Sequence, residues 1–325
     1  MNIITSTHNV HVPSGIYANV PLAPLNWFQT GGHARYLSQP TTLQEFCIAL
    51  QFAREHELPV FLLGEGANIL VSDDGFDGLV IRPQLKEITA DDIDAQQVLV
   101  TAQAGVTMND LITWCLERNV IGLEEFSGIP STVGGAVYIN LHYFEFLLEH
   151  FLVHAQIVNK SSGIIVTVDK NWFNFVYNYS KLHDGNHYLI DATFKLKKVD
   201  LIKNAYAHGR REETMRHRAK RYPSAGTCGS FFRNFYDHEV SIIDHGRKMI
   251  FVAYYLDKLG VKGSLRHGNA MVSYQHANMI VNTGGATSSD IISVARTMQE
   301  MVKQEFGITP HPECRLIGFK ESPLL

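Results

Sequence analysis

The sequence predicts an α+β protein with two domains. Helical and strand-like hydrophobic periods follow one another in irregular order, without the long strand–helix alternation of a doubly wound parallel sheet. The 325 residues are about twice the length of a typical domain. Hydrophobic residues make up 45% and charged residues 18%, which is typical of a globular chain and excludes a disordered or collagen-like one.

The first half of the sequence alternates short apolar runs with two amphipathic helices. We expect residues 1–25 to form an arm over the body of the protein. Thr41 or Thr42 caps a helix that runs to about residue 52, and Pro59 ends that segment. A second helix is predicted over residues 108–116. The predicted strands are residues 60–63, 79–81, 98–102, 155–158, 164–168 and 187–196.

Three helices are predicted in the second half. A charged helix covers residues 204–221, and an apolar helix over residues 249–259 ends at Gly260. Thr287 and Asp290 have the spacing of a capping box and begin a helix that ends at Gly307. We expect a domain boundary near residue 197, giving domains 1–197 and 198–325. The tail after about residue 309 is expected to pack on the first domain.

Charge and cysteine content narrow the possible functions. With 28 Lys and Arg against 32 Asp and Glu, the chain lacks the basic excess of a nucleic-acid-binding protein. No membrane helix or secretory signal is recognisable. The four cysteines form no CxxC pair, and the 16 histidines show no HExxH spacing. We therefore expect a cytoplasmic protein without disulfides, a metal or an obligate protein partner.

Two glycine-rich loops stand out in the first half. Gly64–Asn68 (GEGAN) follows a strand directly, but no helix follows it, so it is not a dinucleotide fingerprint or a Walker loop. Taken alone, it is better explained as an ordinary tight turn. Residues 126–136 (FSGIPSTVGGA) form a second loop, too poor in large side chains to pack a core and too apolar for a linker. Together the loops suggest a cradle for an extended ligand that carries phosphate.

The segments GEGANILVSDDGFDGLVI and GIPSTVGGAVYIN resemble the FAD-binding half of the UDP-N-acetylenolpyruvoylglucosamine reductase family, which belongs to the vanillyl-alcohol-oxidase/PCMH (VAO/PCMH) flavoprotein superfamily. NWFQTGGHARY, SAGTCGSFFRN, GVKGSLRHGNAMVSYQHANMIVN and FGITPHPECRLIG are similar to other segments of that family, in the same order. The resemblance extends from about residue 26 to residue 318. It implies a VAO/PCMH-type FAD-binding domain of two α+β subdomains, followed by an α+β substrate-binding domain.

The resemblance also implies a reaction. In the family, NADPH reduces FAD, and the reduced flavin passes a hydride to C3 of an enolpyruvyl ether while a protein acid protonates C2. The substrate is a nucleotide sugar, UDP-N-acetylglucosamine enolpyruvate. The product, UDP-N-acetylmuramate, is a precursor of peptidoglycan and therefore serves cell-wall biogenesis, cell shape and cell division.

The family motifs assign roles to residues of this chain. Ser230 aligns with the proton donor and Glu313 with the catalytic glutamate, and Tyr177, Arg218, Arg233 and Asn234 align with substrate-binding positions. From the residues alone, Ser230 is better explained by turn chemistry, and Glu313 has the alternative of a surface or ion-paired carboxylate, with Arg315 as the candidate partner. Cys228 is a minor rival proton donor that is better explained as a small buried residue. The expected FAD contacts are Leu63, Gly64, Glu65, Gly66, Ala67, Asn68, Ile69, Leu70, Ser127, Gly128, Ile129, Pro130, Thr132, Gly134 and Gly135.

The chain departs from the family pattern near the presumed substrate. Asn178 occupies the position of the third catalytic residue, an arginine, and a neutral amide cannot form the bidentate fork of a guanidinium. Lys181 or an arginine within residues 210–221 could replace it. Bulky residues at 141–146 stand where the family has small ones, and Ser131 replaces a glycine. These changes favour two alternatives, an FAD-dependent paralogue with another substrate and a non-catalytic flavin-binding scaffold, although Ser230 and Glu313 argue against the scaffold.

Overall fold

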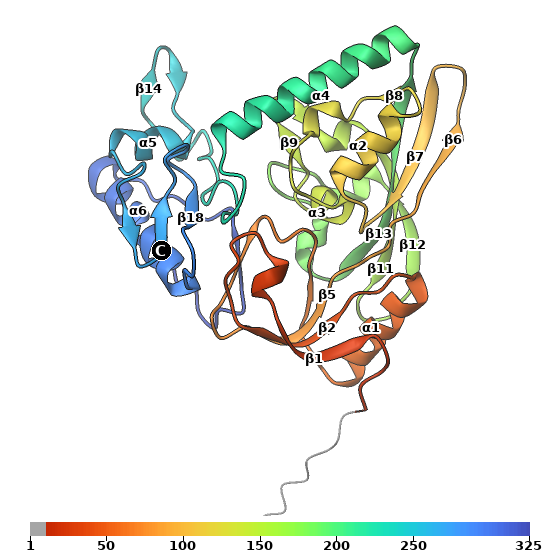
Figure 1. Ribbon diagram of the computed structural model, residues 1–325, viewed down its shortest axis with the longest axis horizontal. Coiled ribbons are helices and arrows are strands. Elements are labelled where there is room, and N and C mark those ends of the chain that lie inside the picture. The colour runs from red at the N-terminus through yellow and green to blue at the C-terminus, as the bar shows by residue number, and fades with distance from the viewer. Residues whose placement is uncertain (1–10) are drawn as a thin grey trace, which may run out of the picture.

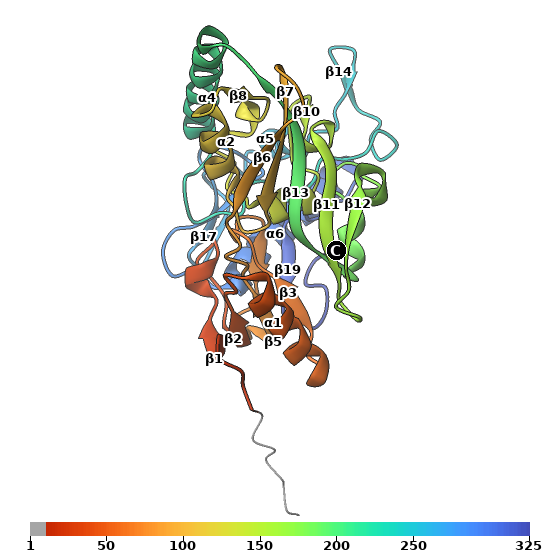
Figure 2. The same cartoon turned by 90° about the vertical axis from the view of Figure 1, so that its right-hand side faces the viewer.

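Residues 11–325 are described by a computed structural model, which has the predicted α+β character (Figure 1). Two sheets with their helices form the first part of the chain, and a smaller region around α5 (Val252–Lys258) and α6 (Ser288–Phe306) forms the last part. Figure 2, turned by 90°, shows the strands β11, β12 and β13 side by side, with the first sheet near the N-terminal end. Within the described residues, no helix has both the length and the apolar character needed to cross a membrane.

The first sheet has the strand order β1-β2-β5-β3. β1 and β2 are antiparallel, whereas β2, β5 and β3 are parallel. The helix α1 (Leu43–Glu55) packs its apolar side chains into the core beside this sheet, and the hydroxyl of Thr42 accepts a hydrogen bond from the Glu45 N–H at its start. The strands are β1 (Ile16–Pro21), β2 (His33–Ser38), β3 (Val60–Leu62) and β5 (Phe76–Ile81).

The arm predicted for residues 1–25 is wrong where the structure describes it. β1 is the edge strand of the first sheet, because its backbone pairs with β2 from Ile16 to Pro21. A short helix, Ala23–Leu25, follows it. Most side chains of β1 are exposed, so the segment lacks the hydrophobic signal that would have identified a strand. Residues 1–10 of the predicted arm lie outside the described residues.

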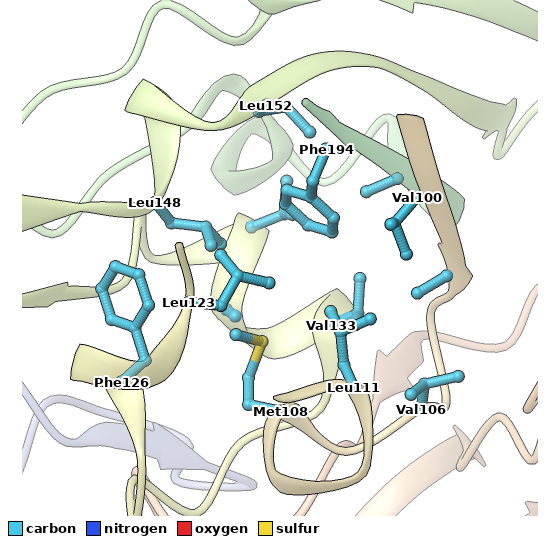
Figure 3. Close-up of a cluster of buried hydrophobic side chains, with 14 of the residues drawn as sticks. Val100, Val106, Met108, Leu111, Leu123, Phe126, Val133, Leu148, Leu152 and Phe194 are labelled. Atoms are coloured by element: carbon cyan, nitrogen blue, oxygen red, sulfur yellow. The ribbon is translucent and has the colours of Figure 1, made fainter. Parts of the chain in front are cut away.

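The second sheet is antiparallel, with the order β12-β11-β13-β7-β6. The helices α2 (Met108–Leu116) and α3 (Val133–Tyr138) pack on it and form a hydrophobic core with β7 and β13 (Figure 3). The sequence reading missed β6 and α3, since β6 is largely exposed and α3 contains two glycines. The strands are β6 (Ile88–Asp92), β7 (Gln97–Gln103), β11 (Leu152–Asn159), β12 (Ile165–Asp169) and β13 (His187–Lys198), and β8 (Val120–Ile121) pairs with the end of β13.

The last part of the chain packs around a further hydrophobic cluster, which also takes in Phe28 and Leu70 of the first part. Phe231, Tyr255 and Met298 are fully buried in it. The helix α6 has the predicted capping box of Thr287 and Asp290 and ends at Gly307 in the left-handed conformation. The elements are α5 (Val252–Lys258), α6 (Ser288–Phe306), β14 (Ile243–Asp244), β15 (Arg247–Lys248), β16 (Arg266–His267), β17 (Ala270–Val272) and β18 (Ile280–Asn282).

The long helix α4 (Leu201–Arg221) connects the two parts. Asn204 Nδ2 donates to the Leu116 carbonyl at 3.0 Å, and Arg210 Nε donates to Glu125 Oε1 at 2.6 Å, so the first turns of α4 are attached to the first part of the chain. A boundary near residue 197 remains a prediction, because these contacts cross it.

The end of the chain returns to the first part. β19 (Arg315–Ile317) pairs in parallel with β4 (Ile69–Val71), the strand that follows the first glycine loop. The carboxylate of Asp73 accepts hydrogen bonds from the N–H groups of Ser288 and Ser289 at the start of α6. These contacts bring the segment before β19 next to the glycine loop.

Candidate active site

A cavity of about 740 Å³ lies where the two glycine loops, α4 and the C-terminal segments meet. Its wall contains the two glycine loops, the loop around Asn178, the loop before Ser230, and Glu313. Segments that are distant in the sequence therefore contribute to one site. Of the predicted site residues, all line this cavity except Leu70, Ser127 and Arg233.

The first glycine loop connects β3 to β4 without a helix, as the sequence predicts. A Cβ on Gly64 would lie 2.8 Å from Thr132 Oγ1, and a Cβ on Gly66, whose φ is +69°, would lie 2.5 Å from the Leu25 carbonyl oxygen. Both collisions are closer than real Cβ contacts, so the neighbouring segments leave room only for glycine.

The backbone of this loop fits a negatively charged ligand. The N–H groups of residues 64–68 donate to no other group within residues 11–325, although they form part of the cavity wall. A run of N–H groups without partners is costly to bury unless a ligand accepts their hydrogen bonds. The pyrophosphate of FAD would supply acceptors of this kind, so the loop fits that cofactor.

The second glycine loop adjoins the first, because Thr132 lies directly beside Gly64. Thr132 caps α3, and its hydroxyl accepts a hydrogen bond from the Gly135 N–H at 3.1 Å. The Gly134 N–H donates to the Ala104 carbonyl on the neighbouring segment at 3.0 Å. These bonds hold the loop rigidly against the second sheet, which positions residues 128–132 along the cavity.

Ser230 and Glu313 belong to two adjacent extended segments. The Glu313 N–H donates to the Phe231 carbonyl at 2.9 Å, and the Arg233 N–H donates to the His311 carbonyl at 3.0 Å. Because these backbone bonds fix the register, Ser230 and Glu313 reach the same cavity although they are far apart in the sequence.

The environment of Glu313 favours its protonated form. Burial raises the pKa of the Glu313 carboxyl to about 7, and the nearby Asn178 side chain opposes this effect only in part. The ion pair with Arg315 that the sequence left open is not formed. The guanidinium of Arg315 instead lies over the Tyr138 ring, 4.6 Å from its centroid. Glu313 can therefore hold a proton near neutral pH, as a general acid requires.

Tyr177 and Asn178 lie next to Glu313. Burial raises the pKa of Tyr177 to about 12, and the nearby Glu313 carboxylate adds to this effect, so the phenol stays protonated. Both polar atoms of the Asn178 carboxamide are buried, and neither has hydrogen-bond geometry to another group of residues 11–325. The Cys228 thiol also lines the cavity, so it stays within reach as a rival proton donor.

Arg218 is the arginine of α4 that lines the cavity. Its Nε donates to the Gly128 carbonyl at 3.0 Å, and its guanidinium lies between the rings of Tyr143 and Tyr222. Burial lowers its pKa, which is the expected effect of removing a cation from water. By contrast, the Lys181 ammonium lies over the Trp172 ring and is not part of the cavity wall.

Three predicted site residues lie outside the cavity wall. Leu70 is fully buried in the core, because β4 pairs there with β19. Ser127 is also fully buried, and its hydroxyl donates to the Glu124 carbonyl at 2.6 Å. Arg233 forms a bidentate ion pair with Glu239, with both N–O distances at 2.8 Å, so its guanidinium is occupied within the protein.

Several cavity residues were not among the predicted contacts. The hairpin formed by β9 (His142–Tyr143) and β10 (Phe146–Leu147) contributes the side chains of residues 142–144, and Tyr143 Oη lies 3.1 Å from His217 Nδ1 of α4. The sequence shows that residues 141–146 are bulky, but it does not indicate that they form a hairpin beside the cavity. Lys160, His183 and His187 line another part of the cavity, and no motif indicated them.

Known proteins resemble this chain over nearly its whole length. The family model "FAD binding domain" matches residues 34–169, and the model "UDP-N-acetylenolpyruvoylglucosamine reductase, C-terminal domain" matches residues 221–317. A protein of that reductase name from Clostridium botulinum is 30% identical over 98% of this chain and 97% of its own length. One from Lactobacillus delbrueckii subsp. bulgaricus is 34% identical over 92% of this chain and 94% of its own length.

A solved structure agrees with these matches. The crystal structure of UDP-N-acetylenolpyruvylglucosamine reductase from Thermus caldophilus has a TM-score of 0.73 and 26% identity, covering 92% of this chain and 97% of its own. The matched segments include both glycine loops and the segments that carry Ser230 and Glu313. The chain therefore belongs to the UDP-N-acetylenolpyruvoylglucosamine reductase family.

Proposed function

We propose that this protein reduces UDP-N-acetylglucosamine enolpyruvate to UDP-N-acetylmuramate with NADPH, using FAD, in the synthesis of peptidoglycan precursors. The observation that carries the proposal is the meeting of Ser230, Glu313 and the glycine loops around one cavity. Bound FAD would supply the hydride-transfer chemistry, taking reducing equivalents from NADPH and delivering them to the substrate.

The glycine loops would hold the cofactor. The unpaired N–H groups of residues 64–68 point to the pyrophosphate as the bound group, because it presents several acceptor oxygens. The second loop, beside the first, would also contact the cofactor, through residues 128–132 and the glycines of α3.

Ser230 and Glu313 would act on the enolpyruvyl group. We assign to Ser230 the delivery of the proton to C2 and to Glu313 the role of the buried acid beside it, whose pKa near 7 suits proton transfer at neutral pH. Arg218 would bind the diphosphate of the substrate, since its guanidinium has no carboxylate partner in residues 11–325. Tyr177 and Asn234 complete this wall.

A second candidate is an FAD-dependent paralogue with a different substrate. The neutral Asn178 and the bulky hairpin of β9 and β10 favour it, because both change the wall that would contact the substrate. We further propose that the protein works in the cytoplasm, where the nucleotide-sugar substrate is made available, and that the FAD-binding part ends near residue 197.

An anaerobic flavin assay separates the two candidates. The purified holoenzyme is reduced with NADPH, and the flavin absorbance is followed after UDP-N-acetylglucosamine enolpyruvate is added. We expect rapid reoxidation of the flavin by this substrate. A flavin that NADPH reduces but that the substrate does not reoxidise would exclude the proposed reaction and favour the paralogue. A protein whose bound flavin NADPH does not reduce would favour the non-catalytic flavin-binding scaffold.

A further inference from the structure

The hairpin of β9 and β10 is held in place from two sides. On one side, Tyr143 Oη lies 3.1 Å from His217 Nδ1, so β9 is attached to α4 (Figure 1). On the other side, the centroid of the His142 ring lies 5.0 Å from that of the Tyr177 ring. The tip of the hairpin, residues 144 and 145, therefore has a defined position beside the cavity.

The first residue of this tip is one that its backbone does not favour. Two residues connect β9 to β10, and only the first of them, Phe144, has a positive φ, of +52°. A two-residue hairpin turn with this pattern favours glycine at its first position, because a Cβ is unfavourable in the left-handed region. The geometry of the turn therefore does not explain why an aromatic residue stands there.

Packing does not explain the Phe144 ring either. The residue stays 64% exposed, whereas the neighbouring Tyr143 is 8% exposed. The centroid of the Phe144 ring lies 4.7 Å from the Tyr143 ring and 6.5 Å from the His217 ring, and the residue lines the cavity. An unfavourable backbone conformation and an exposed apolar ring are both costs in the free protein, which points to a role of the ring in binding.

A free cation lies next to this ring. The guanidinium of Arg218 is 5.7 Å from the centroid of the Tyr143 ring, on which the Phe144 ring packs. Arg218 has no carboxylate partner in residues 11–325. A nucleotide matches this pair of groups, because its base stacks on an aromatic face and its phosphates pair with a guanidinium.

On the basis of the function proposed above, we infer that Phe144 is a specificity-determining residue whose ring stacks on the base of the nucleotide that Arg218 binds by its phosphates. The uracil of the nucleotide sugar and a ring of NADPH are two sources of such a base. The hairpin lies within residues 141–146, the segment in which this chain departs from the family pattern.

Three substitutions separate the ring from the turn. Phe144→Gly removes the ring and suits the backbone, so it should weaken nucleotide binding about tenfold while the urea midpoint of unfolding stays close to that of the wild type. Phe144→Tyr keeps an aromatic face and should bind within about twofold of the wild type. His245→Gly is the matched control and should leave binding unchanged. His245 begins the two-residue turn between β14 and β15, has a φ of +47° and is not part of the cavity wall.

Two ligands identify the base. UDP-N-acetylglucosamine lacks the enolpyruvyl group and is not reduced, so its affinity for the oxidised holoenzyme is measured by calorimetry. The affinity for NADPH is taken from the concentration dependence of anaerobic flavin reduction. Weaker binding of UDP-N-acetylglucosamine by Phe144→Gly would identify uracil as the stacked base, and weaker binding of NADPH alone would identify a ring of that dinucleotide. Either result supports the inference.

Three results would overturn the inference and leave the proposed function standing. These are unchanged affinity of Phe144→Gly for both ligands, binding by Phe144→Tyr as weak as that by Phe144→Gly, and a large loss of stability in Phe144→Gly, which would make the ring a structural one. A wild-type holoenzyme that binds neither nucleotide would contradict the proposed function, and the inference with it.

Discussion

The two walls of the cavity are built in different ways. The glycine-loop wall, residues 64–68 and 128–135, presents mostly backbone to the cavity. Its packing requires that Gly64 and Gly66 carry no side chain. The reaction wall, formed by Tyr177, Asn178, Ser230 and Glu313, acts through side chains. A side chain can change without moving the backbone, so the reaction wall can differ from the family pattern while the cofactor wall keeps it. The fold is therefore a better guide to the cofactor than to the substrate.

The largest effect is expected from a side chain added to the glycine-loop wall. Gly66→Ala should abolish FAD binding and lower the free energy of unfolding by about 3 kcal/mol or more, because the new Cβ collides with backbone atoms of Leu25 and Asn26. Flavin absorbance per protein and denaturant unfolding measure the two effects. Gly246→Ala is the control, since Gly246 has a similar φ of +76° and open space around it. Equal losses in the two variants would mean that the collision is not the cause.

A substitution in the reaction wall should separate activity from cofactor binding. Glu313→Gln removes the buried acid at nearly constant volume and should lower kcat by about 10²–10⁴-fold while the flavin content stays normal. Steady-state kinetics and the flavin spectrum of the same preparation test this. If the variant lost its flavin, the two walls would not be independent.

The pH dependence of stability should reflect the reaction wall as well. Glu313 has a pKa of about 7 when folded and an ordinary value of 4.5 when exposed, so the folded protein binds more protons between these pH values. The free energy of unfolding should therefore fall as the pH rises from 5 to 8, by on the order of 2 kcal/mol more than in Glu313→Gln. Urea unfolding of both proteins across this range measures the difference. Parallel curves would show that Glu313 is not buried as described.

The smallest effect is expected at the junction of the two walls. Arg218→Ala should raise the KM for the nucleotide sugar by about tenfold with little change in kcat, because it removes a cation that binds substrate without taking part in the chemistry. Arg216→Ala is the matched control on the same helix, since Arg216 is exposed. A similar KM in both variants would exclude Arg218 from substrate binding.

Local signals in the sequence predicted the helices α1, α2, α4 and α6. The caps at Thr42 and Thr287 and the stop at Gly307 depend on residues within one turn, and the structure confirms them. β1, β4 and β6 were missed because a short strand or one with exposed side chains becomes recognisable only through its partner.

In the reaction wall, the motif order pointed to Ser230 and Glu313, but only the fold places Asn178 beside Glu313. The fold also reveals that the guanidinium of Arg233 forms an ion pair with Glu239. Both contacts depend on side-chain directions and on chain segments whose meeting no local pattern encodes.

The pairing of β19 with β4 has a consequence for biosynthesis. β4, the strand after the first glycine loop, can pair only after residues 315–317 of β19 have been synthesised. Glu313 lies two residues before β19. During translation, the second sheet and its helices can fold early, because their strands lie within residues 88–198. The reaction wall is completed only when nearly the whole chain has left the ribosome, so an unfinished chain can gather much of the cofactor-binding region but cannot catalyse the reaction.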